Sequence, residues 1–228
     1  MDESTKKEYW NTYRWRKSLR LSSSILIVGG GPSLEGQKDL LRHVPFDTFA
    51  CNRFTLWEER PFLPTYYACS ANAVLRDVEP ADPPAAQRRF IVSRRRDQLE
   101  GWDGWTPVYK KEWHDLLLPG VEEPLVRGGA TMPGIMAQLA IWMGYTKLYF
   151  VGIEQRGSGH VYDPNGELRV HYFIPDEDKL FAHWRVIKKT YEDMGVELTD
   201  CTPNGRLNGI LGYEPLSEVL SGATIPTS

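Results

Sequence analysis

The sequence predicts one α/β domain with a Rossmann-like, mostly parallel sheet and helices on both faces. Three observations support this prediction. Short apolar runs typical of buried strands alternate with helical segments along the chain. The first run ends in three glycines that lead directly into a helix. A length of 228 residues suits a single domain. We expect an N-terminal helical lead-in over residues 1–20, the domain over 21–222 and a tail over 223–228.

Composition narrows the functional class. A formal net charge of −3 argues against a dedicated nucleic-acid binder. Three cysteines without a CxxC pair indicate neither a disulfide framework nor a zinc site. The chain starts without an apolar leader and has no run of about 18 apolar residues, so we expect a cytoplasmic protein without a transmembrane segment. The oligomeric state is left open, and a homo-oligomer is one of the options.

The first half of the chain begins with aromatic and basic residues, where Tyr9 and Tyr13 lie one helical turn apart. Next comes a continuous apolar run over 24–28, which is typical of a strand buried on both faces. The pattern then predicts a helix over 35–43 and strands over 47–51, 65–69 and 89–93. Residues 94–127 show no clear periodicity, and we expect irregular structure there.

The second half regains order at Thr131, which is placed to cap a helix that takes Pro133 in its first turn and ends at Gly144. A buried strand is expected over 147–151. Residues 176–194 show the clearest helical pattern, with acidic residues at the start and Gly195 as the stop. A last strand is expected over 196–200. In such sheets ligands bind beyond the carboxyl ends of the strands.

The turn formed by Gly29, Gly30, Gly31, Pro32 and Ser33 carries the strongest local signal. Glycines let backbone N–H groups approach a phosphate, and the helix N-terminus adds partial positive charge. Pro32 suits the first helical turn, and Ser33 can offer its hydroxyl near the helix start. The pattern is neither GxGxxG nor a Walker A loop. Both a phosphate site and a purely structural turn therefore remain open.

Six motifs in order resemble the family named after archaeal 6-hydroxymethylpterin diphosphokinase, and they are also similar to the related bacterial lipooligosaccharide sialyltransferases. The motifs are Gly-Gly-Gly-Pro-Ser-Leu at 29–34, Cys-Asn-Arg-Phe at 51–54, Pro-Thr-Tyr-Tyr at 64–67, Gly-Gly-Ala-Thr at 128–131, the stretch from Met143 to Glu154, and Asp-Cys-Thr-Pro-Asn-Gly at 200–205. The resemblance spans about residues 24–220. Two departures are Gly30, where the sialyltransferases carry Asn, and Glu154, where they carry Asp.

The resemblance implies a nucleotide or nucleotide-sugar ligand, with a CMP-type ligand favoured. Gly29, Gly31, Pro32 and Ser33 would then line the phosphate or ribose. By the same carry-over, Asn52 would hydrogen-bond the nucleotide, while Gly129 and Thr131 would contact the base or phosphates. Tyr162 and His171 lie in the segment where the sialyltransferases hold the leaving phosphate and deprotonate the acceptor.

Histidine suits a base role near neutral pH, and His160 is a rival to His171. A packed tyrosine and a solvated histidine are the structural alternatives. Glu154, Asp163 and Asp176 could instead hold Mg²⁺ for diphosphoryl transfer, although Asp176 also fits a helix N-cap. No resident metal site is predicted.

Three functions follow from this reading. The leading one is a glycosyltransferase-like enzyme that uses a small nucleotide-sugar donor and a hydroxyl acceptor. The second is an Mg²⁺-dependent diphosphokinase. The third is a module that binds a nucleotide without turnover. Resemblance in fold cannot decide between them, because function depends on the site.

Overall fold

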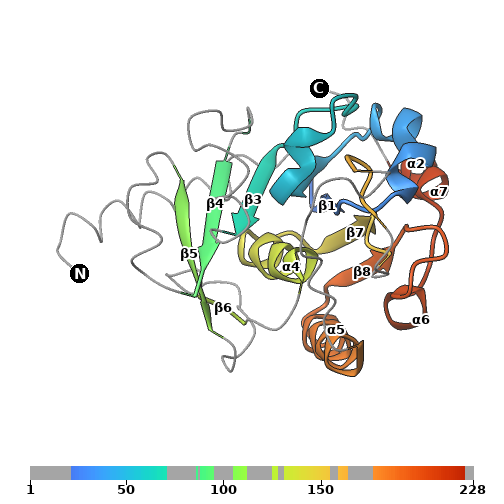
Figure 1. Cartoon of the computed structure of the whole chain (residues 1–228). Helices are drawn as coiled ribbons and strands as arrows, with labels where there is room; N and C mark the ends of the chain where they lie inside the picture. Colours follow the sequence, from blue (N-terminus) through green and yellow to red (C-terminus); the bar gives the residue numbers. More distant parts are fainter. Residues whose placement is uncertain are drawn as a thin grey trace.

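The protein is described here from a computed structural model, which places residues 22–70, 86, 88–94, 105–111, 125–127, 131–154, 159–163 and 177–223. The expected lead-in helix, the chain end beyond residue 223, His171, Gly129 and Asp176 lie outside these described residues. Within them the chain forms one α/β sheet with flanking helices (Figure 1).

The sheet has eight strands in the order β6-β5-β4-β3-β2-β1-β7-β8, and every pairing is parallel. The predicted Rossmann-like α/β class is therefore confirmed. The strands are β1 (Ser24–Val28), β2 (Asp47–Cys51), β3 (Tyr66–Ser70), β4 (Arg88–Ser93), β5 (Thr106–Lys111), β6 (Leu125–Arg127), β7 (Lys147–Val151) and β8 (Glu197–Asp200).

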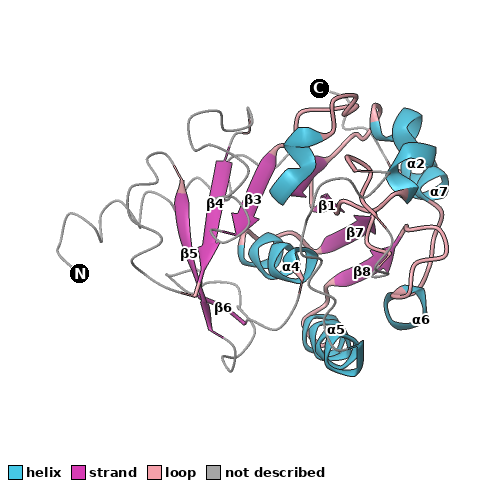
Figure 2. Ribbon diagram, in the orientation of Figure 1, coloured by secondary structure: helices cyan, strands magenta, loops and turns pink. Residues whose placement is uncertain are grey.

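Helices follow or connect the strands on both faces, as Figure 2 shows. They are α2 (Ser33–Leu41), α4 (Met132–Trp142), α5 (Glu177–Glu192), α6 (Asn208–Leu211) and α7 (Leu216–Gly222), together with the 3₁₀ segment η1 (Asn52–Leu56). None of the helices in the described part of the chain has the length and apolarity that crossing a bilayer requires.

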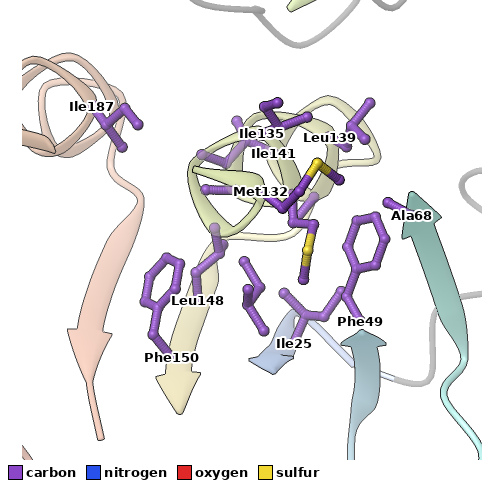
Figure 3. Close-up of a cluster of buried hydrophobic side chains, with 14 of the residues drawn as sticks. Ile25, Phe49, Ala68, Met132, Ile135, Leu139, Ile141, Leu148, Phe150 and Ile187 are labelled. Atoms are coloured by element: carbon purple, nitrogen blue, oxygen red, sulfur yellow. The ribbon is translucent and has the colours of Figure 1, made fainter. Parts of the chain in front are cut away.

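The strand β1 shows why helices must cover both faces of the sheet. Ile25 and Ile27 belong to the hydrophobic cluster beneath α4 and α5, whereas Leu26 and Val28 belong to the opposite cluster, with residues of α2 and α7. Successive strand residues point to opposite faces, so a strand between two helical layers must be apolar throughout. Figure 3 shows Ile25, Phe49 and Leu148 pointing toward α4.

The central helix α4 is buried along its whole length, from Met132 to Trp142. A helix that is apolar on every side belongs inside a protein, which agrees with the sequence MPGIMAQLAIW. Thr131 occupies its N-cap position as predicted, but the threonine side chain makes no capping hydrogen bond.

The prediction of irregular structure over residues 94–127 was wrong, because β5 and β6 extend the sheet there. β5 reads Thr-Pro-Val-Tyr-Lys-Lys and β6 has three residues. Pro107 and the terminal lysines of β5 hide the apolar pattern that marks a strand. β5 and β6 are held in the sheet by hydrogen bonds to the adjacent strands, and a local sequence pattern does not show such pairing.

Candidate functional site at the switch point of the sheet

The candidate site lies where β1 meets β7. The chain moves outward in one direction from β1 through β2 to β6, and β7 and β8 continue on the other side of β1. Connections therefore diverge above the carboxyl ends of β1 and β7, which is where open α/β sheets form their ligand crevice. These ends are tied together, because the Gly29 N–H donates to the Val151 carbonyl and the Gly31 N–H to the Gly152 carbonyl, both at 2.8 Å.

Two glycines of the turn are required by close packing. A Cβ atom at Gly29 would lie 2.2 Å from the backbone oxygen of Gly152, and a backbone atom cannot move aside as a flexible side chain can. A Cβ atom at Gly31 would lie 1.5 Å from Oε2 of Glu154. The space that Gly31 leaves open is therefore filled by a carboxylate of the chain itself.

Glu154 follows the end of β7 and reaches the N-terminus of α2. Its Oε1 accepts a hydrogen bond from the Ser33 N–H at 2.7 Å. The first N–H groups of a helix lack intrahelical partners, and a negative group is favourable there. The N-cap residue Pro32 makes no side-chain cap, so Glu154 supplies the cap. The expectation that the Ser33 hydroxyl caps the helix was wrong: Ser33 is the first helical residue, and its Oγ is buried with no hydrogen-bond partner among the described residues.

Gly30, between these two glycines, contacts a pair of stacked rings. The Gly30 carbonyl accepts the Val161 N–H at 2.9 Å and lies 3.1 Å from Nδ1 of His160. The His160 and Tyr162 rings stack with centroids 4.8 Å apart and planes at 17°. The sequence placed Tyr162 and His160 in one candidate segment, and the structure places both against the turn.

The hydrogen bond to Gly30 fixes the tautomer of His160. A carbonyl oxygen only accepts hydrogen bonds, so Nδ1 carries the proton and Nε2 is the acceptor nitrogen of the neutral ring. Burial lowers the pKa of His160 and the nearby charge of Arg53 adds to this, which together outweigh the Gly30 carbonyl and the charges of Asp163 and Glu154, all of which raise it. His160 is therefore held in the neutral form that a general base requires at neutral pH.

Asn52 marks the end of β2 and adopts a left-handed backbone conformation, with φ of 50°. Asparagine tolerates this region better than most residues do. The Asn52 Oδ1 accepts the Ser70 N–H at 3.1 Å, and the Asn52 carbonyl accepts a hydrogen bond from the Tyr67 hydroxyl. The side-chain oxygen thus ties β2 to β3, which leaves the amide nitrogen of the same group as a donor.

A supporting loop after β8 holds the Glu154 strand end in place, and sequence reasoning assigned it no role. The Thr202 Oγ1 accepts the Ile153 N–H at 3.3 Å, and the Thr202 N–H donates to Oδ1 of Asp200 at 2.9 Å. The Arg206 N–H donates to the Glu154 carbonyl at 3.4 Å. The motif Asp-Cys-Thr-Pro-Asn-Gly at 200–205 was the available signal, because its polar residues follow a buried strand.

Asp200 is fully buried at the base of this loop. With its amide nitrogen turned toward Asp200, Asn208 donates to the second carboxylate oxygen at 2.6 Å. Burial raises the pKa of Asp200 to about 6, against the two hydrogen bonds from Thr202, and the charge of Glu154 raises it further. Two buried carboxylates thus lie close enough to repel each other.

The remaining residues that the sequence singled out lie around the candidate site or in the core. Thr131 lies at the start of α4, on the carboxyl edge of the sheet because α4 returns from β6. Asp163 is buried, and its N–H donates to the His160 carbonyl at 2.9 Å. Cys51 is buried as expected of a core cysteine, and burial raises the pKa of its thiol to about 12. Within the described ranges no group of three or more His, Cys, Asp or Glu side chains is arranged to hold a metal ion.

The sheet order and the flanking helices define a Rossmann-like α/β protein, with the candidate site at its switch point. No protein-family model matches the chain, and no curated protein does. Among solved structures, the chain is similar to the sialyltransferase CstII from Campylobacter jejuni in complex with the substrate analogue CMP-3FNeuAc. That match has a TM-score of 0.56 and 16% identity and covers 84% of this chain and 86% of the other.

The same enzyme in complex with cytidine-5′-monophosphate matches with a TM-score of 0.52 and 18% identity, covering 85% of each chain. At this identity the likeness shows a shared fold. It agrees with the sialyltransferase side of the resemblance seen in the sequence motifs. The diphosphokinase side receives no support from these comparisons and stays a prediction.

Proposed function

We propose that this protein is a transferase that binds a nucleotide-activated sugar at the switch point and passes the sugar to a hydroxyl acceptor. The observation that carries the proposal is the His160–Tyr162 pair stacked against Gly30 of the glycine turn. A neutral histidine and a phenol at one strand end supply a base and a hydrogen-bond donor, which sugar transfer needs. The similar enzyme of known structure was solved with a CMP-sugar analogue and with CMP, which supports the donor class.

In the proposed reaction, Nε2 of a neutral histidine takes the proton of the acceptor hydroxyl. The acceptor oxygen then forms a bond to the anomeric carbon, and the bond from that carbon to the phosphate oxygen breaks with its electron pair. The nucleotide leaves with its phosphate, whose developing charge accepts a hydrogen bond from the Tyr162 hydroxyl. His160 fits the base role by its tautomer and its neutral form, and His171 remains the other candidate.

The nucleotide is expected to contact the ends of β1, β2 and α4. Asn52 presents its amide nitrogen as a donor because Ser70 holds the oxygen. Ligand groups that face Asn52 should therefore be acceptors, such as a ring carbonyl or a ribose oxygen. Gly29, Pro32, Gly129 and Thr131 are proposed to line the same ligand.

The test is a binding and activity panel. CMP, CDP, UDP, GDP and ATP are titrated by calorimetry with and without Mg²⁺, and CMP-sugar turnover is then measured with simple sugar acceptors. We expect CMP-type ligands to bind. Replacing the base should lower turnover by about 10²- to 10⁴-fold while nucleotide affinity stays within about twofold.

His160→Ala and His171→Ala, measured side by side, identify which histidine is the base. Loss in His171→Ala alone moves the base to His171 and leaves the transferase proposal standing. Activity with ATP that disappears with a chelator and survives both histidine variants would instead establish the diphosphokinase.

A further inference from the structure

The N-terminus of α2 already binds an anion, and that anion belongs to the protein. Oε1 of Glu154 accepts the Ser33 N–H at 2.7 Å, and Glu154 is only 9% exposed. α2 has nine residues, long enough for its terminal N–H groups to favour negative charge. A carboxylate is thus found where a ligand phosphate is expected in this fold.

The fit of this carboxylate is incomplete. Oε2 of Glu154 is buried without a hydrogen-bond partner among the described residues, and so is the hydroxyl of Ser33 beside it. A buried charged oxygen without a partner is costly, as is a buried hydroxyl without one. The charge of Glu154 also acts on the buried carboxyl of Asp200. The unpartnered Oε2, the unpartnered Ser33 hydroxyl and the repulsion from Asp200 all disfavour the position of the Glu154 side chain at the N-terminus of α2.

A phosphate would satisfy the groups that Glu154 leaves unsatisfied. A tetrahedral anion with several acceptor oxygens can take both the Ser33 N–H and the Ser33 hydroxyl. The absence of a side chain at Gly31 provides the space, since Oε2 occupies the position that a Cβ atom would take. Both anions cannot occupy this space together.

We propose that Glu154 is an internal placeholder for the ligand phosphate, which must displace the carboxylate to reach the N-terminus of α2. This inference rests on the proposed function in taking a nucleotide phosphate as the ligand group. The proposal predicts that Glu154, although it lies in the candidate site, weakens the binding of the ligand phosphate. Removing the negative charge should tighten the binding of phosphate-bearing ligands.

The experiment compares wild type with Glu154→Gln, which keeps the shape and removes the charge. Glu35→Gln is the matched control, because Glu35 lies in the first turn of the same helix and is exposed. CMP, inorganic phosphate and the phosphate-free nucleoside cytidine are titrated by calorimetry at fixed salt. We expect the Kd of CMP to fall about tenfold in Glu154→Gln, the scale of one charge-assisted hydrogen bond. Cytidine affinity and the control variant should change less than twofold.

Each other outcome decides the question. Equal CMP affinity in all three proteins overturns the placeholder and leaves the proposed function standing. Weaker binding of both CMP and cytidine in Glu154→Gln also overturns it, because Glu154 would then contact the ligand directly. A gain for inorganic phosphate alone, with no nucleotide bound by either protein, supports the placeholder and rejects the nucleotide function. If the Glu154→Gln variant is not stable enough for calorimetry, Glu154→Ala is used in its place, and the same increase in CMP affinity is expected.

Discussion

Replacing Gly31 with alanine tests whether the glycine is required by Glu154. No positive φ restricts this position, so alanine can adopt the backbone conformation, and the nearest obstacle is the Glu154 carboxylate, whose Oε2 lies 1.5 Å from the new Cβ atom. Expelling Glu154 removes its bond to the Ser33 N–H, a charge-assisted hydrogen bond worth about 1.5–3 kcal/mol. Alanine returns about 0.4–1 kcal/mol by restricting the unfolded chain. We therefore expect the free energy of unfolding to fall by about 1–2 kcal/mol.

Urea unfolding followed by tryptophan fluorescence measures this change, because Trp184 and Trp57 are buried. Gly36→Ala in the same helix is the matched control: nothing lies within 4 Å of its new Cβ atom, and alanine in a helix interior should stabilise by up to about 1 kcal/mol. In a Glu154→Ala background, Gly31→Ala should become neutral or stabilising. A double-mutant coupling energy below about 0.5 kcal/mol would refute the claim that these two residues compete for one space.

Two further predictions concern residues that support the candidate site. The pKa of Asp200 rises from 3.8 to about 6 on folding, so its contribution to stability is fully present below pH 3.8 and is lost as pH rises through about 6. Wild type should therefore lose about 2 kcal/mol relative to Asp200→Asn between pH 4 and 7, measured by urea unfolding at each pH; parallel pH profiles would contradict this assignment. Asn52→Asp keeps the acceptor for Ser70 but removes the amide donor, so nucleotide affinity should fall about tenfold with little change in melting temperature. A fall in melting temperature with unchanged affinity would make Asn52 purely structural.

The central strands were predictable because each is buried on both faces. The runs over 24–28, 47–51 and 147–151 match β1, β2 and β7 residue for residue. A strand between two helical layers is apolar at most positions, and this demand is local enough to read, even though β2 begins with the buried polar residues Asp47 and Thr48. The helix expected over 176–194 was likewise found as α5 over Glu177–Glu192, since its apolar stripe and its acidic start are both local signals.

The cap of α2 could not be predicted in the same way. The sequence suggested the neighbouring Ser33 hydroxyl, but the group that caps the helix is Glu154, 121 residues away. The support from Asp200 and Thr202 comes from residues even farther from the turn along the chain. These contacts exist because parallel strands bring their carboxyl ends to one edge of the sheet. The sequence identified which strand ends carry polar residues but not which of them would pair.

The glycine turn shows why its motif left two readings open. A phosphate at a helix N-terminus needs a residue without a side chain beside it, so that the anion and the N–H groups can meet. An internal carboxylate at the same N–H group needs the same space, and Gly31 provides it for Glu154. A glycine-rich turn after a strand therefore indicates that an anion lies at the helix start, but it does not say which molecule supplies the anion. If Glu154 is the placeholder that we propose, the structural and the ligand-binding interpretations describe two occupants of one position, and removing a single charge measures the competition between them.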